Sequence, residues 1–146
     1  ILDEYIDEAL SNNYNFKITF IGDLSFLDKN IKNKINKLEQ INKYKKFNLI
    51  IFLNYSGQDD ILNSIKKLKK NSSQSYNLKN YLATKNIPNP DLIIRSGGFK
   101  RISNFMLFEI AFTEFSFTKK LWSDLYNSDI DKFIKSYFIT ERKFGL

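Results

Sequence analysis

The sequence has 146 residues, of which 42% are hydrophobic and 16% aromatic, and its formal net charge is +7. This length and apolar content predict a single domain over residues 1–146 with a hydrophobic core of its own. Cysteine and histidine are absent, which excludes disulfides, thiolate metal sites and a histidine general base within these residues.

The distribution of apolar and charged residues argues against a membrane-spanning protein and against a nucleic-acid-binding one. No apolar run approaches the roughly 20 residues that span a bilayer, and no charged-then-apolar signal segment opens the chain. We therefore expect a cytoplasmic protein. The lysines fall on the polar faces of helical patterns, as at Lys34, Lys37 and Lys66. We interpret the positive charge as a solvated surface and expect no nucleic-acid partner.

Helical and strand patterns alternate along the chain. Apolar residues recur at three- and four-residue steps in the predicted helices, and short apolar runs mark the predicted strands. The first helical pattern has no N-cap residue ahead of it and no starting methionine, so we expect these residues to be part of a longer protein. In chain order we predict a helix over residues 1–10, a strand over 17–21, a helix over 31–41, a strand over 49–53, a helix over 61–68, a helix over 76–83 and a strand over 91–95.

This alternation predicts an α/β domain. Strands that are apolar throughout are typical of parallel sheets covered on both sides, so we expect a mostly parallel sheet flanked by helices on both faces. Ligands of such sheets bind beyond the carboxyl ends of the strands. We therefore expect Asp23, the turn at residues 54–57 and the turn at residues 95–98 to converge at one edge of the sheet.

Residues 90–114 combine a strand, a glycine corner and a predicted helix start. The paired glycines at 97–98 end the strand abruptly and would let backbone N–H groups converge on an anion. Arg95 and Arg101 flank this corner with guanidinium groups, and Ser103 stands where a helix N-cap belongs. The pattern predicts a phosphate site. The alternative interpretation is that Arg95 is an ordinary structural ion-pair partner.

At these motifs the sequence resembles the cis-prenyltransferases, the undecaprenyl diphosphate synthase family. Residues 87–122 read IPNPDLIIRSGGFKRISNFMLFEIAFTEFSFTKKLW, similar to the family's Pro-Asp-Leu-x-Ile-Arg-Thr-Gly-Gly, Arg-x-Ser-Asn-Phe and Ala-x-x-Glu-x-x-Phe motifs. FIGD at 20–23, NYSG at 54–57 and ERKFGL at 141–146 resemble further motifs of the family. The resemblance implies a cis-prenyltransferase-like fold truncated at the amino terminus, of which these residues form the carboxyl-terminal part.

The resemblance also implies an activity. Family members add isopentenyl diphosphate to an allylic prenyl diphosphate, with Mg²⁺, to make cis-polyprenyl diphosphates such as the precursor of undecaprenyl-type lipid carriers. By resemblance, Glu114 is a ligand of the magnesium. The catalytic residues are expected in the missing amino-terminal segment, so we expect these 146 residues alone to be inactive. The residues implied to bind isopentenyl diphosphate are Arg95, Arg101, Ile102 and Ser103.

Two kinds of partner follow from the same resemblance. Family members dimerise, so we expect a homodimer to which residues 105–117 and the carboxyl tail contribute. The charges of Arg142 and Lys143 favour a peripheral contact with the anionic membrane where the product resides.

Departures from the family pattern leave a second hypothesis open. Phe99 and Lys100 stand where bacterial members commonly carry an acidic residue and a histidine, and Gln58 stands where the family often has arginine. A diverged, non-catalytic subunit that stabilises an active prenyltransferase would tolerate such changes. Upstream sequence is the discriminating observation, because a preserved Asp-Gly-Asn-Gly-Arg segment favours the enzyme.

Overall fold

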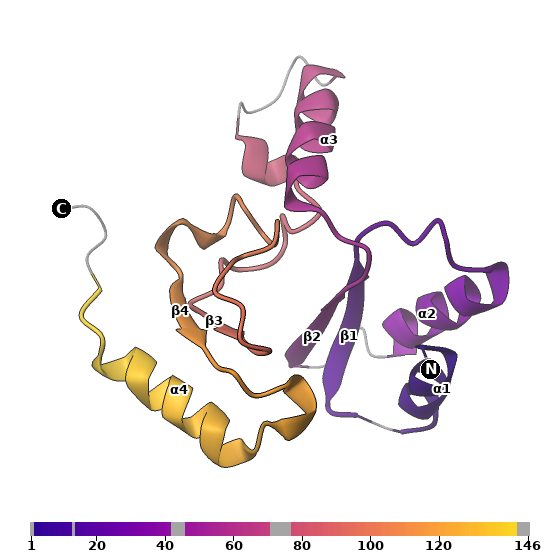
Figure 1. Ribbon diagram of the computed structural model, residues 1–146. Helices are drawn as coiled ribbons and strands as arrows, with labels where there is room; N and C mark the ends of the chain where they lie inside the picture. Colours follow the sequence, from indigo (N-terminus) through magenta and orange to yellow (C-terminus); the bar gives the residue numbers. More distant parts are fainter. Residues whose placement is uncertain (1, 13, 42–45, 71–76, 143–146) are drawn as a thin grey trace.

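The computed structural model describes residues 2–12, 14–41, 46–70 and 77–142 (Figure 1). None of the helices in these ranges is both long enough and apolar enough to cross a membrane. The predicted contributions of Lys143 and of the ERKFGL tail beyond residue 142 lie outside the described residues. The elements in chain order are α1 (Leu2–Ser11), β1 (Phe16–Ile21), α2 (Lys29–Ile41), β2 (Phe47–Phe52), α3 (Gly57–Lys70), β3 (Leu92–Arg95), β4 (Glu114–Phe117) and α4 (Asn127–Ile139), with short 3-10 helices at Leu78–Tyr81, Ile110–Phe112 and Trp122–Asp124.

The strands pair in parallel as two separate two-stranded sheets. β1 pairs with β2 from Phe16 opposite Phe47 to Ile21 opposite Phe52. β3 pairs with β4 from Leu92 opposite Glu114 onward. The two sheets lie beside each other in Figure 1, and the remaining edges of β2 and β3 have no strand partner within the described ranges. Within each pair the two strands therefore end on the same side, but the two pairs do not form one continuous sheet.

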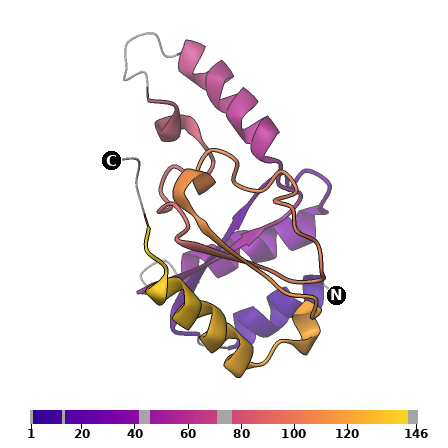
Figure 2. The ribbon, with the colours of Figure 1, turned by 60° about the vertical axis from the view of Figure 1, so that its left-hand side comes forward.

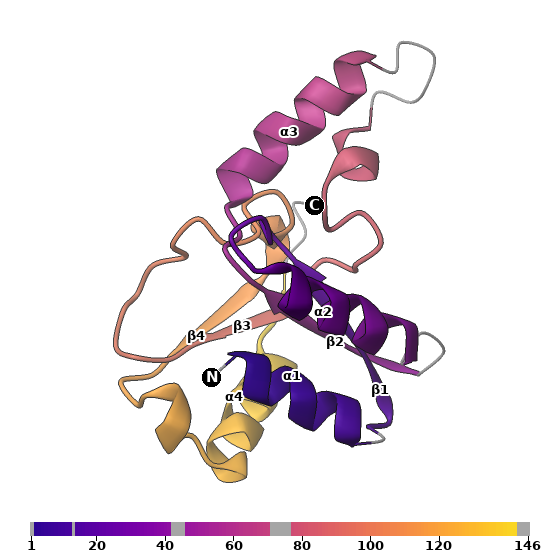
Figure 3. The same cartoon turned by 90° about the vertical axis from the view of Figure 1, so that its right-hand side faces the viewer.

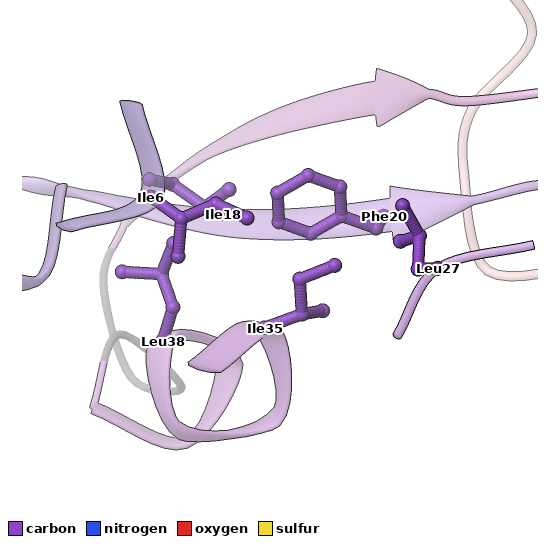
Figure 4. Packing of buried hydrophobic residues seen from close by; sticks show 6 residues of the cluster. All are labelled: Ile6, Ile18, Phe20, Leu27, Ile35 and Leu38. Carbon is purple, nitrogen blue, oxygen red and sulfur yellow. The ribbon is translucent and has the colours of Figure 1, made fainter. Parts of the chain in front are cut away.

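Helices α1 and α2 lie together against the β1–β2 sheet (Figure 3), while α3 extends away from both sheets (Figure 2). The buried cluster between the two helices and β1 is apolar because each element presents apolar residues at its own period, alternate positions on the strand and three- to four-residue steps on the helices. Burial of each such side chain stabilises the fold by about 1.5–3 kcal/mol. The cluster consists of Ile6, Ile18, Phe20, Leu27, Ile35 and Leu38 (Figure 4).

The predicted α/β class, with parallel strands flanked by helices, is confirmed. The strands predicted at 17–21, 49–53 and 91–95 correspond to β1, β2 and β3. The three predicted helices that lie before residue 71 correspond to α1, α2 and α3.

Two helix predictions were wrong. Residues 103–109 form turns and not the α-helix predicted to start at Ser103, because Ser103, Asn104 and Met106 have φ angles of 50°, 62° and 46° that a right-handed helix cannot include. The chain then continues into β4, a strand that was not predicted because these residues were assigned to the helix. The helix predicted over 76–83 is a 3-10 helix at Leu78–Tyr81 in its described part, and residue 76 lies outside the described ranges.

Candidate anion-binding site

The glycine corner follows β3 directly. Gly97 and Gly98 have φ angles of 84° and 82°, a conformation that residues with a Cβ adopt at a cost. Their N–H groups donate to the carbonyl oxygens of Lys120 and Thr118, at 2.8 and 2.9 Å. The prediction that these N–H groups converge on an anion was therefore wrong, because both donors are already used to join the corner to the segment after β4. An anion at the corner would therefore have to be bound by side chains.

Arg95 is the last residue of β3, and its side chain is half-buried. Neither Arg95 nor Arg101 forms an ion pair with any carboxylate in the part of the chain that the structure describes. A partly desolvated guanidinium without an anion is unfavourable unless a ligand supplies the charge. The alternative interpretation of Arg95 as a structural ion-pair partner finds no support among these residues.

Arg101 lies on the exposed loop after the corner. Its guanidinium carbon is 4.3 Å from the centre of the Phe99 ring, a cation–π contact that restrains the side chain and leaves its charge unneutralised. Phe99 thus acts on Arg101 by stacking, where a carboxylate would have paired with it.

The two arginines share one small pocket of about 150 Å³. Its wall is otherwise apolar, made by β3, β4 and the loop between them. A pocket of this kind suits a ligand with an anionic group and a short hydrocarbon. The lining residues are Ile93, Ile94, Arg95, Arg101, Ile102, Phe105, Phe115 and Phe117.

Two other predicted site residues lie outside this pocket. Ser103 is exposed and adjoins the lining residue Ile102. Glu114 begins β4 opposite Leu92, and its N–H donates to the carbonyl oxygen of Asp91 at 3.0 Å. Because β3 and β4 are parallel, Glu114 is at the opposite end of the pair from Arg95, which pairs with Phe117.

The described residues do not make a complete metal site. Within those ranges, no group of three or more Asp and Glu side chains is placed to hold a metal ion. Glu114 can offer oxygen ligands to a hard cation, but a full coordination shell would need several more ligands than the described residues place beside it.

A larger pocket, of about 460 Å³, lies at the carboxyl ends of β1 and β2. Asp23 and the 54–57 turn both contribute to it, as predicted, but Arg95 lines the smaller pocket instead, so the predicted convergence is only partial. Hydrogen bonds from the hydroxyl and the backbone N–H of Ser25 lower the pKa of the Asp23 carboxyl. Asp23 is thus held as a carboxylate at the mouth of this pocket.

In the larger pocket, Asp60 was not singled out from the sequence, and Tyr55 was named only as part of the 54–57 turn. The Tyr55 hydroxyl donates to Asp60 Oδ2 at 3.2 Å. Burial, and then the carboxylates of Asp60 and Glu109, raise the pKa of the Tyr55 hydroxyl above its ordinary value of 10.0. Glu109 is only 2% exposed and accepts a hydrogen bond from the Thr84 hydroxyl. Of these three groups Glu109 is buried, whereas Tyr55 and Asp60 are half-buried. Nothing local in the sequence distinguishes them from surface polar groups.

Comparison with known proteins assigns the chain to a family. Residues 1–145 match the family described as "Putative undecaprenyl diphosphate synthase". The farnesyl-diphosphate-specific ditrans,polycis-undecaprenyl-diphosphate synthase of Buchnera aphidicola (strain Sg) is 40% identical over 145 residues, which are 92% of this chain and 58% of that protein. The corresponding synthase of Coxiella burnetii is 36% identical, over 99% of this chain and 65% of that protein.

Solved structures agree with this assignment. A probable undecaprenyl diphosphate synthase from Campylobacter jejuni superposes with a TM-score of 0.87 and 29% identity, covering 99% of this chain and 71% of the other. Lavandulyl diphosphate synthase from Lavandula x intermedia, in complex with dimethylallyl diphosphate, superposes with a TM-score of 0.86 and 29% identity, covering 99% and 66%.

Fold and site together define an α/β protein that presents unpaired guanidinium groups where a parallel strand ends. The chain belongs to the undecaprenyl diphosphate synthase family of cis-prenyltransferases. It spans about 58–65% of the length of the curated relatives described above.

Proposed function

We propose that this chain is part of a cis-prenyltransferase that condenses isopentenyl diphosphate with an allylic prenyl diphosphate to give a cis-polyprenyl diphosphate of the undecaprenyl type. In this proposal the small pocket beside β3 is the isopentenyl diphosphate site. The observation that carries it is the pair of guanidinium groups, Arg95 and Arg101, which share an apolar pocket without a carboxylate partner among the described residues. The names of the relatives support the reaction class.

The pocket fits both parts of isopentenyl diphosphate. A diphosphate needs strong donors held in place, and each charge-assisted hydrogen bond contributes about 1.5–3 kcal/mol. The five-carbon chain needs a small apolar wall, which Ile93 and Phe115 supply beside Arg95. In the proposal Ile102 completes this wall and the exposed Ser103 hydroxyl donates to the diphosphate from the loop.

The reaction requires the protein to position its two substrates, and it needs no covalent bond between substrate and protein. The bond between carbon 1 of the allylic chain and its diphosphate oxygen breaks, and the electron pair leaves with the diphosphate. The isopentenyl double bond attacks that carbon through its terminal CH₂, and a proton is then lost from carbon 2 of the isopentenyl unit. Arg95 and Arg101 hold the isopentenyl diphosphate still, so that its double bond meets the allylic carbon at reacting distance. The groups that hold the allylic diphosphate are proposed to come from outside these 146 residues, which alone would then be inactive.

Magnesium is proposed as the cofactor of the complete enzyme, where a bound divalent cation would neutralise diphosphate charge. Glu114, which lies at the opposite end of the β3–β4 pair from Arg95, is proposed as one of its ligands, with the others from the allylic diphosphate and from polypeptide outside the described residues. Chelation should abolish the activity and added Mg²⁺ should restore it. Glu114→Gln should raise the Mg²⁺ concentration needed for half-maximal rate, and an unchanged requirement would remove Glu114 from the metal site.

The activity is tested on the full-length gene product. Radiolabelled isopentenyl diphosphate, farnesyl diphosphate and Mg²⁺ should give labelled long prenyl chains, and no incorporation would count against an enzyme. Arg95→Ala and Arg101→Ala should each raise KM for isopentenyl diphosphate by roughly 10- to 100-fold, since each removes a charged donor. Lys37→Ala, an exposed cation on α2, is the matched control and should leave KM unchanged.

A second candidate function is a non-catalytic subunit that stabilises an active prenyltransferase. The stacking of Phe99 on Arg101 favours it, because the aromatic ring stands where a catalytic loop of the family commonly carries acid. A subunit of this kind would show no incorporation alone, while raising the rate or stability of the active partner with which it is co-purified.

A homodimer and a peripheral membrane contact are proposed as partners. Exposed apolar side chains at the carboxyl-terminal end support both proposals: Trp122, Phe138 and Ile139 are 75%, 77% and 85% exposed. Sedimentation of the full-length protein should give twice the chain mass, and a monomer would reject the dimer. Flotation with anionic vesicles, compared with neutral ones, measures the membrane contact.

A further inference from the structure

Asn104 connects the loop that carries Arg101 to the amino-terminal end of α3. The N–H of Gly57 donates to the Asn104 carbonyl oxygen at 2.8 Å, and the N–H of Gln58 donates to Asn104 Oδ1 at 2.9 Å. The Asn104 side-chain amide donates to Ser56 Oγ at 2.9 Å. One residue thus makes two hydrogen bonds to a helix that begins 47 positions earlier in the chain and a third to Ser56, the residue just before that helix.

These bonds serve the helix as well as the loop. The first N–H groups of any α-helix lack partners inside it. In α3 two of them are capped by Asn104, while Ser56 Oγ accepts from the N–H of Asp59 at 3.2 Å. A Cβ on Gly57 would lie 2.9 Å from the Asn104 carbonyl oxygen, so glycine is required for the close approach of the two segments.

The loop around Asn104 is strained. Ser103, Asn104 and Met106 have left-handed φ angles of 50°, 62° and 46°, and residues other than glycine pay about 1–3 kcal/mol for such conformations when they are poorly populated. Contacts that hold the loop include the three bonds of Asn104, the ring contact of Phe105 with Phe52 and the burial of Met106, which is 4% exposed. A backbone conformation of this kind persists only where its surroundings enforce it.

We propose that Asn104 is a positioning residue for diphosphate binding: by fastening the strained loop to α3 it holds Arg101 at the pocket beside β3 and Ser103 next to that pocket. Arg101 is three positions before Asn104, and Phe105, one position after it, lines the same pocket. Phe105 also packs edge-on against Phe52, with ring centres 4.9 Å apart. Loss of the Asn104 side-chain bonds would therefore hold the loop, and with it the Arg101 guanidinium, less firmly at the pocket. This inference rests on the proposed function, because it assigns a role at the same site.

The test compares Asn104→Gly with the wild type in the full-length protein. Glycine accepts the left-handed backbone and keeps the carbonyl oxygen, so that the variant loses only the two side-chain hydrogen bonds. We expect the dissociation constant for inorganic diphosphate, measured by calorimetry, to rise roughly 5- to 30-fold, and KM for isopentenyl diphosphate to rise by a similar factor. The KM for the allylic substrate should stay within about twofold, and kcat should fall less than KM rises.

A second variant removes the acceptor on the α3 side, together with the bond by which Ser56 Oγ caps the Asp59 N–H. Ser56→Ala removes the acceptor of the Asn104 amide, so it should raise the same constants by a smaller factor, and adding it to Asn104→Gly should have little further effect on those constants, while the lost cap of the Asp59 N–H lowers the melting temperature in both backgrounds. If Asn104→Gly does not fold, Ser56→Ala carries the test alone. Asn36→Ala, on the exposed face of α2, is the matched control.

The outcomes separate the inference from the function on which it rests. Unchanged diphosphate affinity and KM in Asn104→Gly, together with weakened binding in Arg101→Ala, would overturn the positioning role alone. A lowered melting temperature with unchanged KM would overturn it too, because the clamp would then be merely structural. Unchanged binding in both Arg95→Ala and Arg101→Ala would reject the proposed site itself.

Discussion

Arg95 combines partial burial with the absence of a carboxylate partner among the described residues. Burial of an unpaired charge costs free energy that an anionic ligand would recover. Residues selected for binding often destabilise the ligand-free fold for this reason. Arg95 should therefore show opposite effects on stability and on affinity, which an arginine in a structural ion pair would not.

Replacement of Arg95 by methionine tests this expectation. Arg95→Met keeps much of the side-chain length and removes the charge, so the melting temperature of the ligand-free protein should rise by roughly 2–5 °C, a gain of about 1 kcal/mol. Diphosphate should no longer stabilise the variant. Arg95→Lys keeps a charge without the planar fork, so diphosphate should still raise its melting temperature, but less than in the wild type. A lower melting temperature for Arg95→Met would mean that Arg95 holds the fold together.

Helix α4 is attached to the end of the β3–β4 sheet through a small group of polar residues. Lys120 Nζ lies 2.7 Å from Asp129 Oδ2, and the same carboxylate accepts from the backbone N–H of Tyr126 at 3.0 Å. The Lys120 carbonyl oxygen accepts from Gly97. The glycine corner and the start of α4 are therefore joined through one residue, Lys120.

This attachment gives a pH dependence whose direction can be derived. Hydrogen bonds from Lys120, and then from the Tyr126 N–H, lower the pKa of the Asp129 carboxyl below its ordinary value of 3.8. A lowered pKa contributes stability that is present above pH 3.8 and is lost as the pH falls through the folded-state pKa. Asp129→Asn should therefore lose less melting temperature between pH 5 and pH 2.5 than the wild type. Equal slopes in the two proteins would show that the attachment contributes nothing.

In the whole molecule, part of the β2 strand is exposed to solvent. Leu49 and Phe47 are 46% and 62% exposed, although their apolar run is typical of a strand buried on both faces. Unpaired, apolar strand edges are a liability in a protein that stands alone. The curated relatives are longer than this chain, which covers 58% of one and 65% of another, so additional polypeptide could cover this surface.

Substitution of Leu49 tests whether additional polypeptide covers β2 in the longer protein. In the 146-residue chain, Leu49→Thr should change the free energy of unfolding by less than about 0.5 kcal/mol, as is usual for an exposed position. In the full-length gene product the same change should cost about 1–3 kcal/mol if other segments bury Leu49. Urea denaturation of both proteins gives the comparison. Equal small effects would mean that β2 remains exposed in the longer protein.

The local sequence by itself determined the α/β class, the three strands with continuous apolar runs, the glycine corner and the two arginines beside it. These features depend on residues within a few positions of one another, and their periodicity and backbone preferences act over that range. The family motifs are also local, which is why the resemblance could be stated before the fold was known.

Only the tertiary structure decided how the corner is used. The N–H groups of Gly97 and Gly98 bond to carbonyl oxygens some 20 positions away, and Asn104 bonds to a helix start 47 positions away. The same long-range contacts hold residues 103–106 out of a helix and place Glu114 at the far end of β4. Hydrogen-bond partners and strand register depend on which distant segments meet, so no pattern of neighbouring residues could specify them.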